Sequence, residues 1–267
     1  MPPLLTVVIP TLGTRSEFLQ EAIRSILSAK ELVRIVVVGP STTLKFLPTE
    51  FPVDLMDDPG GGPAAAINFG MRAASTDYVT WLGDDDLLAG HRVADMCSRL
   101  DSVPSAPYLY GDCWLIDSAG RPISLMRPGL LAEHLLRIGP DRLPQPGSIL
   151  RRTAVEAVGF LNTDLSYAFD LDLFLRLRKI GKPVRLRVPL ACFRLHANSL
   201  TVSNPRPGLE ARQVRRSAGS PLLRLTEPIL YPVVKVATRL LAKYQWHVPR
   251  QSAFESGRHS FLSPANE

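Results

Sequence analysis

Residues 78–86 read Tyr-Val-Thr-Trp-Leu-Gly-Asp-Asp-Asp, an apolar run that ends in three adjacent carboxylates. A short apolar run rich in β-branched and aromatic residues is typical of a buried strand. Carboxylates this close repel one another, so outside a solvated turn they need a compensating cation. Ligands of parallel α/β sheets bind at the carboxyl ends of the strands, which is where Asp84, Asp85 and Asp86 fall. We therefore predict a site for Mg²⁺ or Mn²⁺, which bind through one or two carboxylates plus substrate phosphates. A solvated acidic turn is the alternative.

Segments around this run alternate between strand and helix character. Apolar runs at 5–10 and 34–39 predict buried strands, and apolar residues at helical spacing lie between them at 19–27. Near-continuously apolar strands that alternate with helices indicate a doubly wound α/β sheet covered on both faces. The remaining segments predict strands at 53–56, 108–116, 147–150 and 184–193, and helices at 63–74, 89–100 and 170–179.

Composition and charge divide the chain into two parts. Its 267 residues are 45% hydrophobic and 21% charged, which excludes a wholly disordered chain and suits one large domain with an appendage. Residues 1–204 carry 21 basic and 21 acidic side chains, whereas residues 205–267 carry 10 and 4. We expect a domain at 1–204, a boundary at Pro205-Arg206-Pro207-Gly208, and a basic C-terminal extension at 205–267. A neutral body argues against nucleic acid as a partner.

The extension contains an apolar and basic stripe at 222–244, for which we expect one or two short helices. This stripe either lies on an anionic lipid surface or packs on the domain. The last 20 or so residues read as a disordered tail. No run approaches 18 apolar residues and the first residues do not resemble a signal peptide, so we expect a cytoplasmic protein that can touch the inner face of the membrane.

The cysteines predict neither disulfides nor a zinc site. Cys97, Cys113 and Cys192 are odd in number and widely spaced, without a Cys-x-x-Cys pair. We expect them to be buried thiols in a reducing compartment.

Four segments, spread over about residues 5–201, resemble the family 2 glycosyltransferases. The resemblance implies the GT-A fold, a Rossmann-like nucleotide-diphospho-sugar transferase sandwich of three layers with a mostly parallel central sheet. It also implies transfer of a hexosyl or deoxyhexosyl group from a nucleotide-sugar donor to an acceptor hydroxyl. The four segments are Val7-Val8-Ile9-Pro10-Thr11, residues 60–70 (Gly-Gly-Gly-Pro-Ala-Ala-Ala-Ile-Asn-Phe-Gly), Trp81-Leu82-Gly83-Asp84-Asp85-Asp86-Leu87-Leu88 and residues 167–177 (Tyr-Ala-Phe-Asp-Leu-Asp-Leu-Phe-Leu-Arg-Leu).

The resemblance also assigns roles on the donor side. By this likeness the nucleotide sugar would contact Pro10, Thr11, Arg15, Ala65, Asn68 and Asp84. The third segment resembles the Asp-x-Asp metal motif, although the usual first Asp falls on Gly83. Mg²⁺ or Mn²⁺ would be held by Asp85, Asp86 and His196, the last from a segment similar to the family's closing motif. The family's usual acid after the second strand is replaced by Gly39. Either Asp57 or Asp58 recognises the donor instead, or the donor is not the commonest uridine one.

On the acceptor side, the fourth segment places the catalytic base on Asp170. Phe169 beside it reduces hydration, which raises the pKa of a carboxyl toward a value useful for a base. An N-cap of the following helix is the alternative role for Asp170. By the same resemblance Gln145, Gly147 and Asp172 lie toward the acceptor.

The function implied is metal-dependent, inverting transfer to a glycan or lipid-linked acceptor in the synthesis of cell-envelope glycans, polysaccharides or glycolipids. Two alternatives remain open. A sugar nucleotidyltransferase would need a Gly-rich basic loop after the first strand, and residues 11–15 are a poor version of one. A degenerate module that binds nucleotide or sugar without turnover is favoured by Gly39, Gly83 and Phe169, which stand where the family usually has acids.

Overall fold

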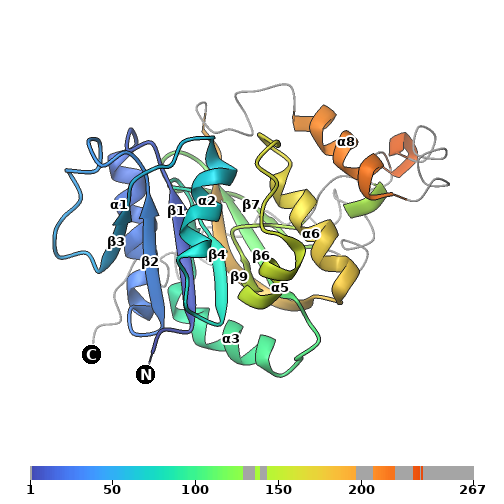
Figure 1. The fold of residues 1–267 in the computed structure, drawn as a ribbon, viewed down its shortest axis with the longest axis horizontal. Coiled ribbons are helices and arrows are strands. Elements are labelled where there is room, and N and C mark those ends of the chain that lie inside the picture. The colour runs from blue at the N-terminus through green and yellow to red at the C-terminus, as the bar shows by residue number, and fades with distance from the viewer. Residues whose placement is uncertain are drawn as a thin grey trace.

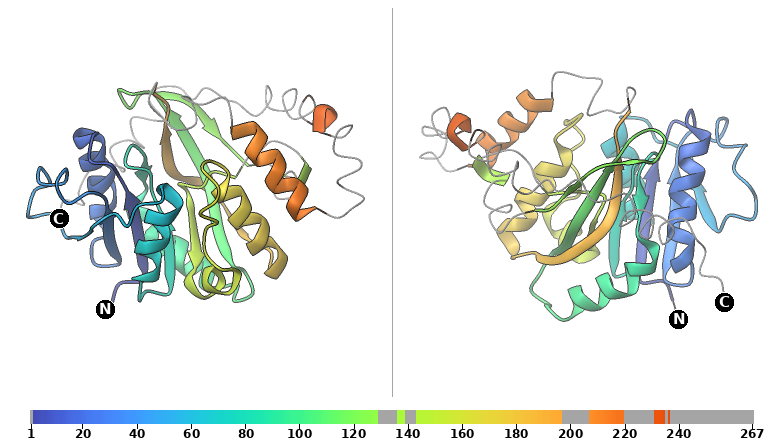
Figure 2. Two further views of the ribbon diagram at one scale, coloured as in Figure 1. Left: turned by 45° about the horizontal axis from the view of Figure 1, so that its top comes forward. Right: turned by 180° about the vertical axis from the view of Figure 1, so that it is seen from behind.

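The computed structural model describes residues 2–128, 136–138, 143–196, 207–219, 231–234 and 236. Its strands form one sheet in the order β3-β2-β1-β4-β8-β6-β9-β5, with β7 paired to β6 (Figure 1). The described helices lie on both faces of this sheet, as the two further views make plain (Figure 2). The α/β class and the covered sheet expected from the sequence are confirmed.

The first half of the sheet is parallel throughout. Its strands β1 (Leu5–Pro10), β2 (Val33–Val38), β3 (Val53–Met56) and β4 (Tyr78–Trp81) pair in parallel, with Val8 opposite both Val36 and Trp81. Because the strands are parallel, the loops that follow all four of them emerge at the same edge of the sheet. That edge receives the acidic run 84–86.

The second half mixes directions. Strand β8 (Ser148–Arg151) is antiparallel to both β4 and β6 (Tyr108–Ile116), whereas β6 and β9 (Val184–Arg194) are parallel. Strand β7 (Pro122–Met126) makes a hairpin with β6, and the two-residue strand β5 (Leu87–Leu88) is antiparallel to β9. The sequence did not predict β5 or β7.

Alternate residues of the central strands face two separate cores. Val7 and Ile9 pack with helices α1 (Ser16–Ile26) and α3 (Val93–Asp101) on one face. Val8 packs on the other face, with α2 (Pro63–Arg72), α5 (Arg152–Val158) and α6 (Phe169–Ile180). The 3₁₀ turns η1 (Leu27–Ala29) and η2 (Gly90–Arg92) complete the described elements of the first core.

Helix α2 approaches the sheet closely at Gly70. A Cβ built there would lie 2.6 Å from Cγ1 of Val8 and 3.2 Å from Cγ2 of Val38, both closer than a packed carbon allows. The family likeness assigns Ala65 and Asn68 of this helix to the nucleotide sugar. The close approach at Gly70 is to β1 and β2, which explains this glycine by packing alone.

The C-terminal extension contains a helix that the sequence did not predict. Helix α8 (Pro207–Ala218) begins inside the expected boundary and packs on α6. Its Val214 is 6% exposed and belongs to the same core as Leu171 and Phe174. Residues 231–234 and 236 are helical, but the rest of the 222–244 stripe and the expected disordered tail lie outside the described residues. Within the described chain, none of the helices has the length and apolar character needed to span a bilayer.

Candidate active site

The end of β1 and the acidic run are joined by Thr11 and Arg15. The Thr11 hydroxyl donates to Oδ2 of Asp84 at 2.6 Å, and Arg15 Nη2 lies 2.6 Å from Oδ1 of the same residue. Asp84 is only 3% exposed, and this burial raises the pKa of its carboxyl, while the Thr11 hydrogen bond and the Arg15 charge act in the opposite direction. The predicted donor residues Thr11, Arg15 and Asp84 are therefore one connected group.

Asp85 contacts the same arginine and His196, which follows the end of β9. Its Oδ2 accepts a hydrogen bond from Arg15 Nη1 at 2.8 Å and lies 2.8 Å from Nε2 of His196. The register of β5 and β9 explains this meeting, because Leu87 is opposite Cys192 and the two strands run in opposite directions. The residues before β5 therefore lie beside those that end β9.

Asp86 points into the protein. It is 4% exposed, and its Oδ1 accepts the backbone N–H of Arg194 at 2.9 Å. Burial, together with the neighbouring charge of Asp85, raises the pKa of Asp86 well above its ordinary value. Of the three residues predicted to hold a metal, Asp85 and His196 are brought into contact, while Asp86 is anchored to β9.

Arg194 at the end of β9, which was not predicted as a site residue, joins the acidic run to α1 and to the turn between β6 and β7. Its side chain is 2% exposed. Nε donates to the carbonyl oxygen of Asp85 at 2.8 Å, Nη2 pairs with Glu21 at 2.6 Å, and Nη1 donates to the carbonyl oxygen of Ser118 at 3.2 Å. Its guanidinium also lies 4.5 Å from the centre of the Phe18 ring. A buried arginine with this many partners fixes the backbone of the loop that carries Asp85.

Gly83 stands where the resemblance places the usual first Asp of the motif. A Cβ at this position would lie 2.8 Å from Asp85 Oδ1 and 2.8 Å from Asp86 Oδ2, so a side chain there would require both carboxylates to shift.

A divalent cation suits the Asp85–His196 pair. Among the described residues, no group of three or more His, Cys, Asp or Glu side chains forms a ready-made metal site. However, a carboxylate oxygen and an imidazole nitrogen 2.8 Å apart offer two ligands, and Mg²⁺ usually takes its remaining ligands from water and phosphate. The guanidinium of Arg15 already places positive charge between Asp84 and Asp85. Asp85 and His196 are therefore the described residues that would hold Mg²⁺ or Mn²⁺.

A cavity of about 350 Å³ opens at the ends of β2 and β3. The Asp57 carboxylate in it accepts the backbone N–H of Ser41 at 2.9 Å. Asp58 instead accepts the backbone N–H of Gly60 within its own loop. Of the two expected substitutes for an acid after β2, Asp57 is the one that lines the cavity. The described lining residues are Gly39, Ser41, Leu44, Lys45, Leu55, Met56 and Asp57.

Asn68 is placed differently from the expectation that it faces a nucleotide. Its Nδ2 donates to the carbonyl oxygen of Leu161 at 2.8 Å, and its Oδ1 accepts the backbone N–H of the same residue at 2.9 Å. Both polar ends of the side chain are thus used to join α2 to the segment after α5. Ala65 lies on the first turn of α2, where Gly61 approaches it.

The predicted base lies at the start of α6, facing the end of β4. Asp170 is the second residue of this helix and is half-buried, and the Phe169 ring beside it lies 6.4 Å from the Trp81 ring. Gln145 is buried and donates through Nε2 to the carbonyl oxygen of Trp81 at 2.7 Å. The start of α6 and Gln145 therefore converge on the strand that leads into the acidic run.

The other two acceptor-side residues take part in the framework. The Gly147 carbonyl oxygen accepts the backbone N–H of Gly111 at 3.0 Å. Asp172 pairs with Arg176 at 2.7 Å, and Arg176 also donates to the carbonyl oxygens of Val158 and Phe160. Asp172 thus orients an arginine that joins α6 to α5.

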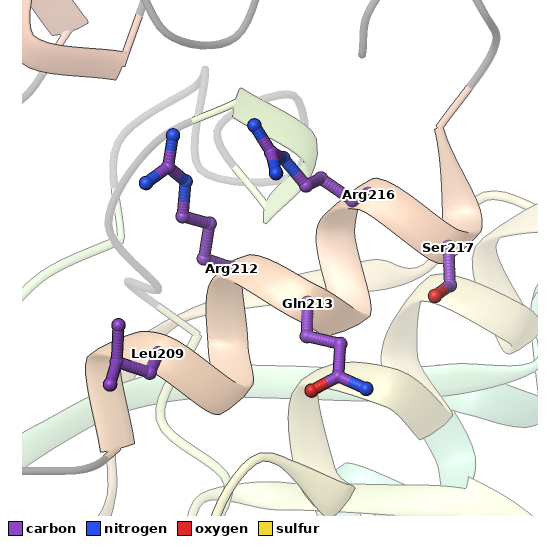
Figure 3. A pocket seen from close by; sticks show the side chains of 5 residues that line it. All are labelled: Leu209, Arg212, Gln213, Arg216 and Ser217. Atoms are coloured by element: carbon purple, nitrogen blue, oxygen red, sulfur yellow. The ribbon is translucent and has the colours of Figure 1, made fainter.

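A larger cavity, of about 580 Å³, runs along α8. Its described lining residues all belong to this helix (Figure 3). Arg212 and Arg216 project from one side of α8, and Gln213 and Ser217 project from the other side. None of the predicted donor, metal or acceptor residues lines this cavity, so we do not assign it to the site.

Comparison with known proteins identifies the family of the chain. The family described as glycosyl transferase family 2 matches residues 6–159. The chain is 24% identical over 171 residues to the uncharacterized glycosyltransferase YwdF of Bacillus subtilis, covering 61% of this chain and 62% of the relative. It is 23% identical over 195 residues to an uncharacterized glycosyltransferase of Rickettsia felis, covering 67% of this chain and 32% of the relative. The chain thus spans less than two thirds of the length of either relative.

Solved structures with the same fold include two in complex with nucleotide sugars. Staphylococcus aureus TarS 1–349 in complex with UDP-GlcNAc superposes with a TM-score of 0.61 at 14% identity, over 80% of this chain and 66% of TarS 1–349. The mannosyltransferase PcManGT from Pyrobaculum calidifontis, in complex with GDP-Man and Mn²⁺, superposes with a TM-score of 0.60 at 16% identity. This match covers 97% of this chain and 80% of PcManGT. These likenesses confirm the GT-A fold. Because the family match covers more than half of its residues, the chain belongs to glycosyl transferase family 2.

Proposed function

We propose that this chain is a metal-dependent inverting glycosyltransferase that moves a hexosyl or deoxyhexosyl group from a nucleotide-sugar donor to an acceptor hydroxyl. The observation that carries the proposal is the Arg15–Asp84–Asp85–His196 cluster at the carboxyl ends of β1 and β4. Carboxylates, a guanidinium and an imidazole gathered at this edge suit a diphosphate and its cation better than any purely structural role.

The nucleotide end of the donor is assigned to the cavity at β2 and β3. Asp57 can accept hydrogen bonds from a base or ribose, and the cavity opens on the same sheet edge as the acidic cluster. Pro10 ends β1 beside it and Thr11 follows, and Ala65 lies in the first turn of α2. The printed titles of TarS and PcManGT, with UDP-GlcNAc and GDP-Man, support a nucleotide sugar as the class of donor.

Asp85 and His196 are the residues assigned to hold the cation. When bound, Mg²⁺ or Mn²⁺ supplies positive charge that stabilises the leaving nucleoside diphosphate. Arg15 can exchange its carboxylate partners for a phosphate oxygen, since a guanidinium binds both groups in the same forked geometry. Asp86, buried on the backbone of Arg194, then holds the loop that presents Asp85.

Asp170 is assigned as the general base. In a single displacement its carboxylate takes the proton from the acceptor hydroxyl while the oxygen of that hydroxyl attacks the anomeric carbon. Phe169, whose ring lies 6.4 Å from the Trp81 ring, is assigned the role of reducing the hydration of this carboxylate. The configuration of the sugar inverts and no covalent intermediate with the protein is needed.

Thermal denaturation tests the donor and cation assignments together. A panel of nucleoside diphosphates and nucleotide sugars, with and without Mn²⁺, is expected to contain a compound that raises the melting temperature only when Mn²⁺ is present. Asp85→Ala should abolish this shift, whereas Asp95→Ala, which removes an exposed carboxylate of α3, should retain it. If no compound shifts the wild-type protein, the donor assignment is wrong.

We further propose a glycan or lipid-linked acceptor in cell-envelope synthesis, with the 222–244 stripe bringing a cytoplasmic enzyme to the inner face of the membrane. The stripe combines apolar residues with four basic ones. Flotation with vesicles containing phosphatidylglycerol tests this. The full chain should float and a 1–219 truncation, which keeps α8, should not; equal flotation contradicts the membrane contact.

A further inference from the structure

The turn before helix α6 is anchored by a residue from another helix. Within the first turn of α6, the backbone N–H of Leu171 donates to Oδ1 of Asp170 at 2.7 Å. In the turn before the helix, the backbone N–H groups of Ser166, Tyr167 and Ala168 all donate to the carboxylate of Glu210, at 2.8, 2.6 and 2.6 Å. Glu210 belongs to α8, more than 40 residues further along the chain.

Three amides on one carboxylate make a strong local anchor. Hydrogen bonds to an ionised acceptor are stronger than those between neutral groups, and negative charge is favoured at the N-terminal end of a helix. The last of the three amides is two residues before Asp170. The carbonyl oxygen of Ala168 also accepts the N–H of Asp172 at 3.0 Å, as the first bond of the helix. The backbone that leads into Asp170 is therefore held on one side by α6 and on the other by Glu210.

Helix α8 is itself firmly placed. Val214 is buried in the core that α6 shares, and Arg215 donates through Nε to the carbonyl oxygen of Leu136 at 3.0 Å. Ala211 and Ala218 pack against the same core. Glu210 therefore belongs to a helix that is packed on the domain, and Figure 1 shows α8 beside α6.

We propose that Glu210 is a positioning residue for the catalytic base, so that α8 of the C-terminal extension is part of the catalytic unit. This rests on the proposed function in that Asp170 is the base. Glu210 fixes the turn before α6 and thereby the direction in which the Asp170 carboxylate points. The hydrogen bonds and ion pairs of Asp84 and Asp85 described above involve no residue of α8. Loss of Glu210 should therefore reduce turnover without weakening the donor site.

The variants that test this are Glu210→Ala and Glu210→Gln, with Gln213→Ala as the control. Alanine removes the acceptor, while glutamine keeps one acceptor oxygen but loses the charge. Gln213 lies on α8 and lines the cavity along it, so its replacement perturbs the same helix without touching the three amides.

Two measurements are made on the full chain. Hydrogen exchange at the amides of 166–168 should become about tenfold faster in Glu210→Ala, less so in Glu210→Gln, and stay unchanged in Gln213→Ala. Hydrolysis of GDP-mannose and UDP-N-acetylglucosamine with Mn²⁺ should show kcat reduced about tenfold or more in Glu210→Ala, with KM for the donor unchanged. Added acetate, compared with chloride at equal ionic strength, should restore part of kcat in the alanine variant because it can occupy the vacated amides.

The outcomes separate this inference from the function on which it rests. Faster exchange with unchanged kcat means that Glu210 only anchors this turn, and the positioning role is wrong. Unchanged exchange contradicts the anchor itself. If the wild-type protein hydrolyses neither donor while Glu210→Ala still exchanges faster, the proposed function and the catalytic role of Glu210 fail but the anchor stands.

Discussion

Replacement of Asn68 by alanine distinguishes a framework role from a role in binding the donor. The side chain is 6% exposed and gives the backbone N–H and C=O of Leu161 their partners. A buried polar group left without a partner costs about 1–3 kcal/mol, so two such groups should lower the free energy of unfolding by about 2–6 kcal/mol. For a protein of this size that corresponds to a fall in melting temperature of roughly 4–20 °C.

Urea unfolding at a constant m-value would measure this loss, and calorimetry with the donor identified in the panel would measure binding. Asn162→Ala is the matched control, because Asn162 is exposed and bonds only to the nearby backbone N–H of Asp164. We expect the control to stay within about 0.5 kcal/mol of the wild-type protein. An Asn68→Ala protein of wild-type stability that binds donor weakly would refute the framework role and restore the expectation from the sequence.

Three further results are expected. Arg15→Gln should lower the melting temperature, because the buried Asp84 loses its counter-charge. Mn²⁺ alone should then raise the melting temperature of this variant more than that of the wild type. Equal rises in the two proteins would argue against a cation beside Asp85. Asp86 has a raised pKa in the folded state, so its ionisation costs stability as the pH rises from about 4. Asp86→Asn should therefore raise the free energy of unfolding by roughly 1–3 kcal/mol near neutrality and by little at pH 4, as measured by urea unfolding. If this increase becomes smaller as the pH rises, the cost of the buried charge is contradicted. Burial raises the pKa of Cys97 to about 12, so a thiol reagent should modify it only after denaturation, and rapid labelling of the native protein would show that its burial is wrong.

The parallel half of the sheet could be predicted because its strands are apolar on both faces. Residues of β1 and β2 are buried almost without interruption, which leaves a clear run in the sequence. The strands β5 and β7 gave no such signal, since β5 has only two residues and β7 is a hairpin partner at the side of the sheet. The burial of the thiols was also predicted, and all three are buried.

The site was predicted in part. The acidic run gave its own signal, because adjacent carboxylates require a cation, and Arg15 supplies one. The contact between Asp85 and His196 depends on the register of β5 with β9, which no local pattern encodes, and it was anticipated only through the family likeness. Glu210 was missed because its partners are backbone amides, and a backbone amide leaves no mark in a sequence.

The most direct test of the account is whether the protein splits a nucleotide sugar through Asp170. Phosphorus NMR of the wild-type chain with Mn²⁺ and either GDP-mannose or UDP-N-acetylglucosamine would follow release of the nucleoside diphosphate. We expect release that stops without the metal, and an Asp170→Asn variant that still binds the donor but releases at most about a hundredth as much per unit time. Release at the wild-type rate by Asp170→Asn, or binding without release by the wild type, would contradict the proposed mechanism.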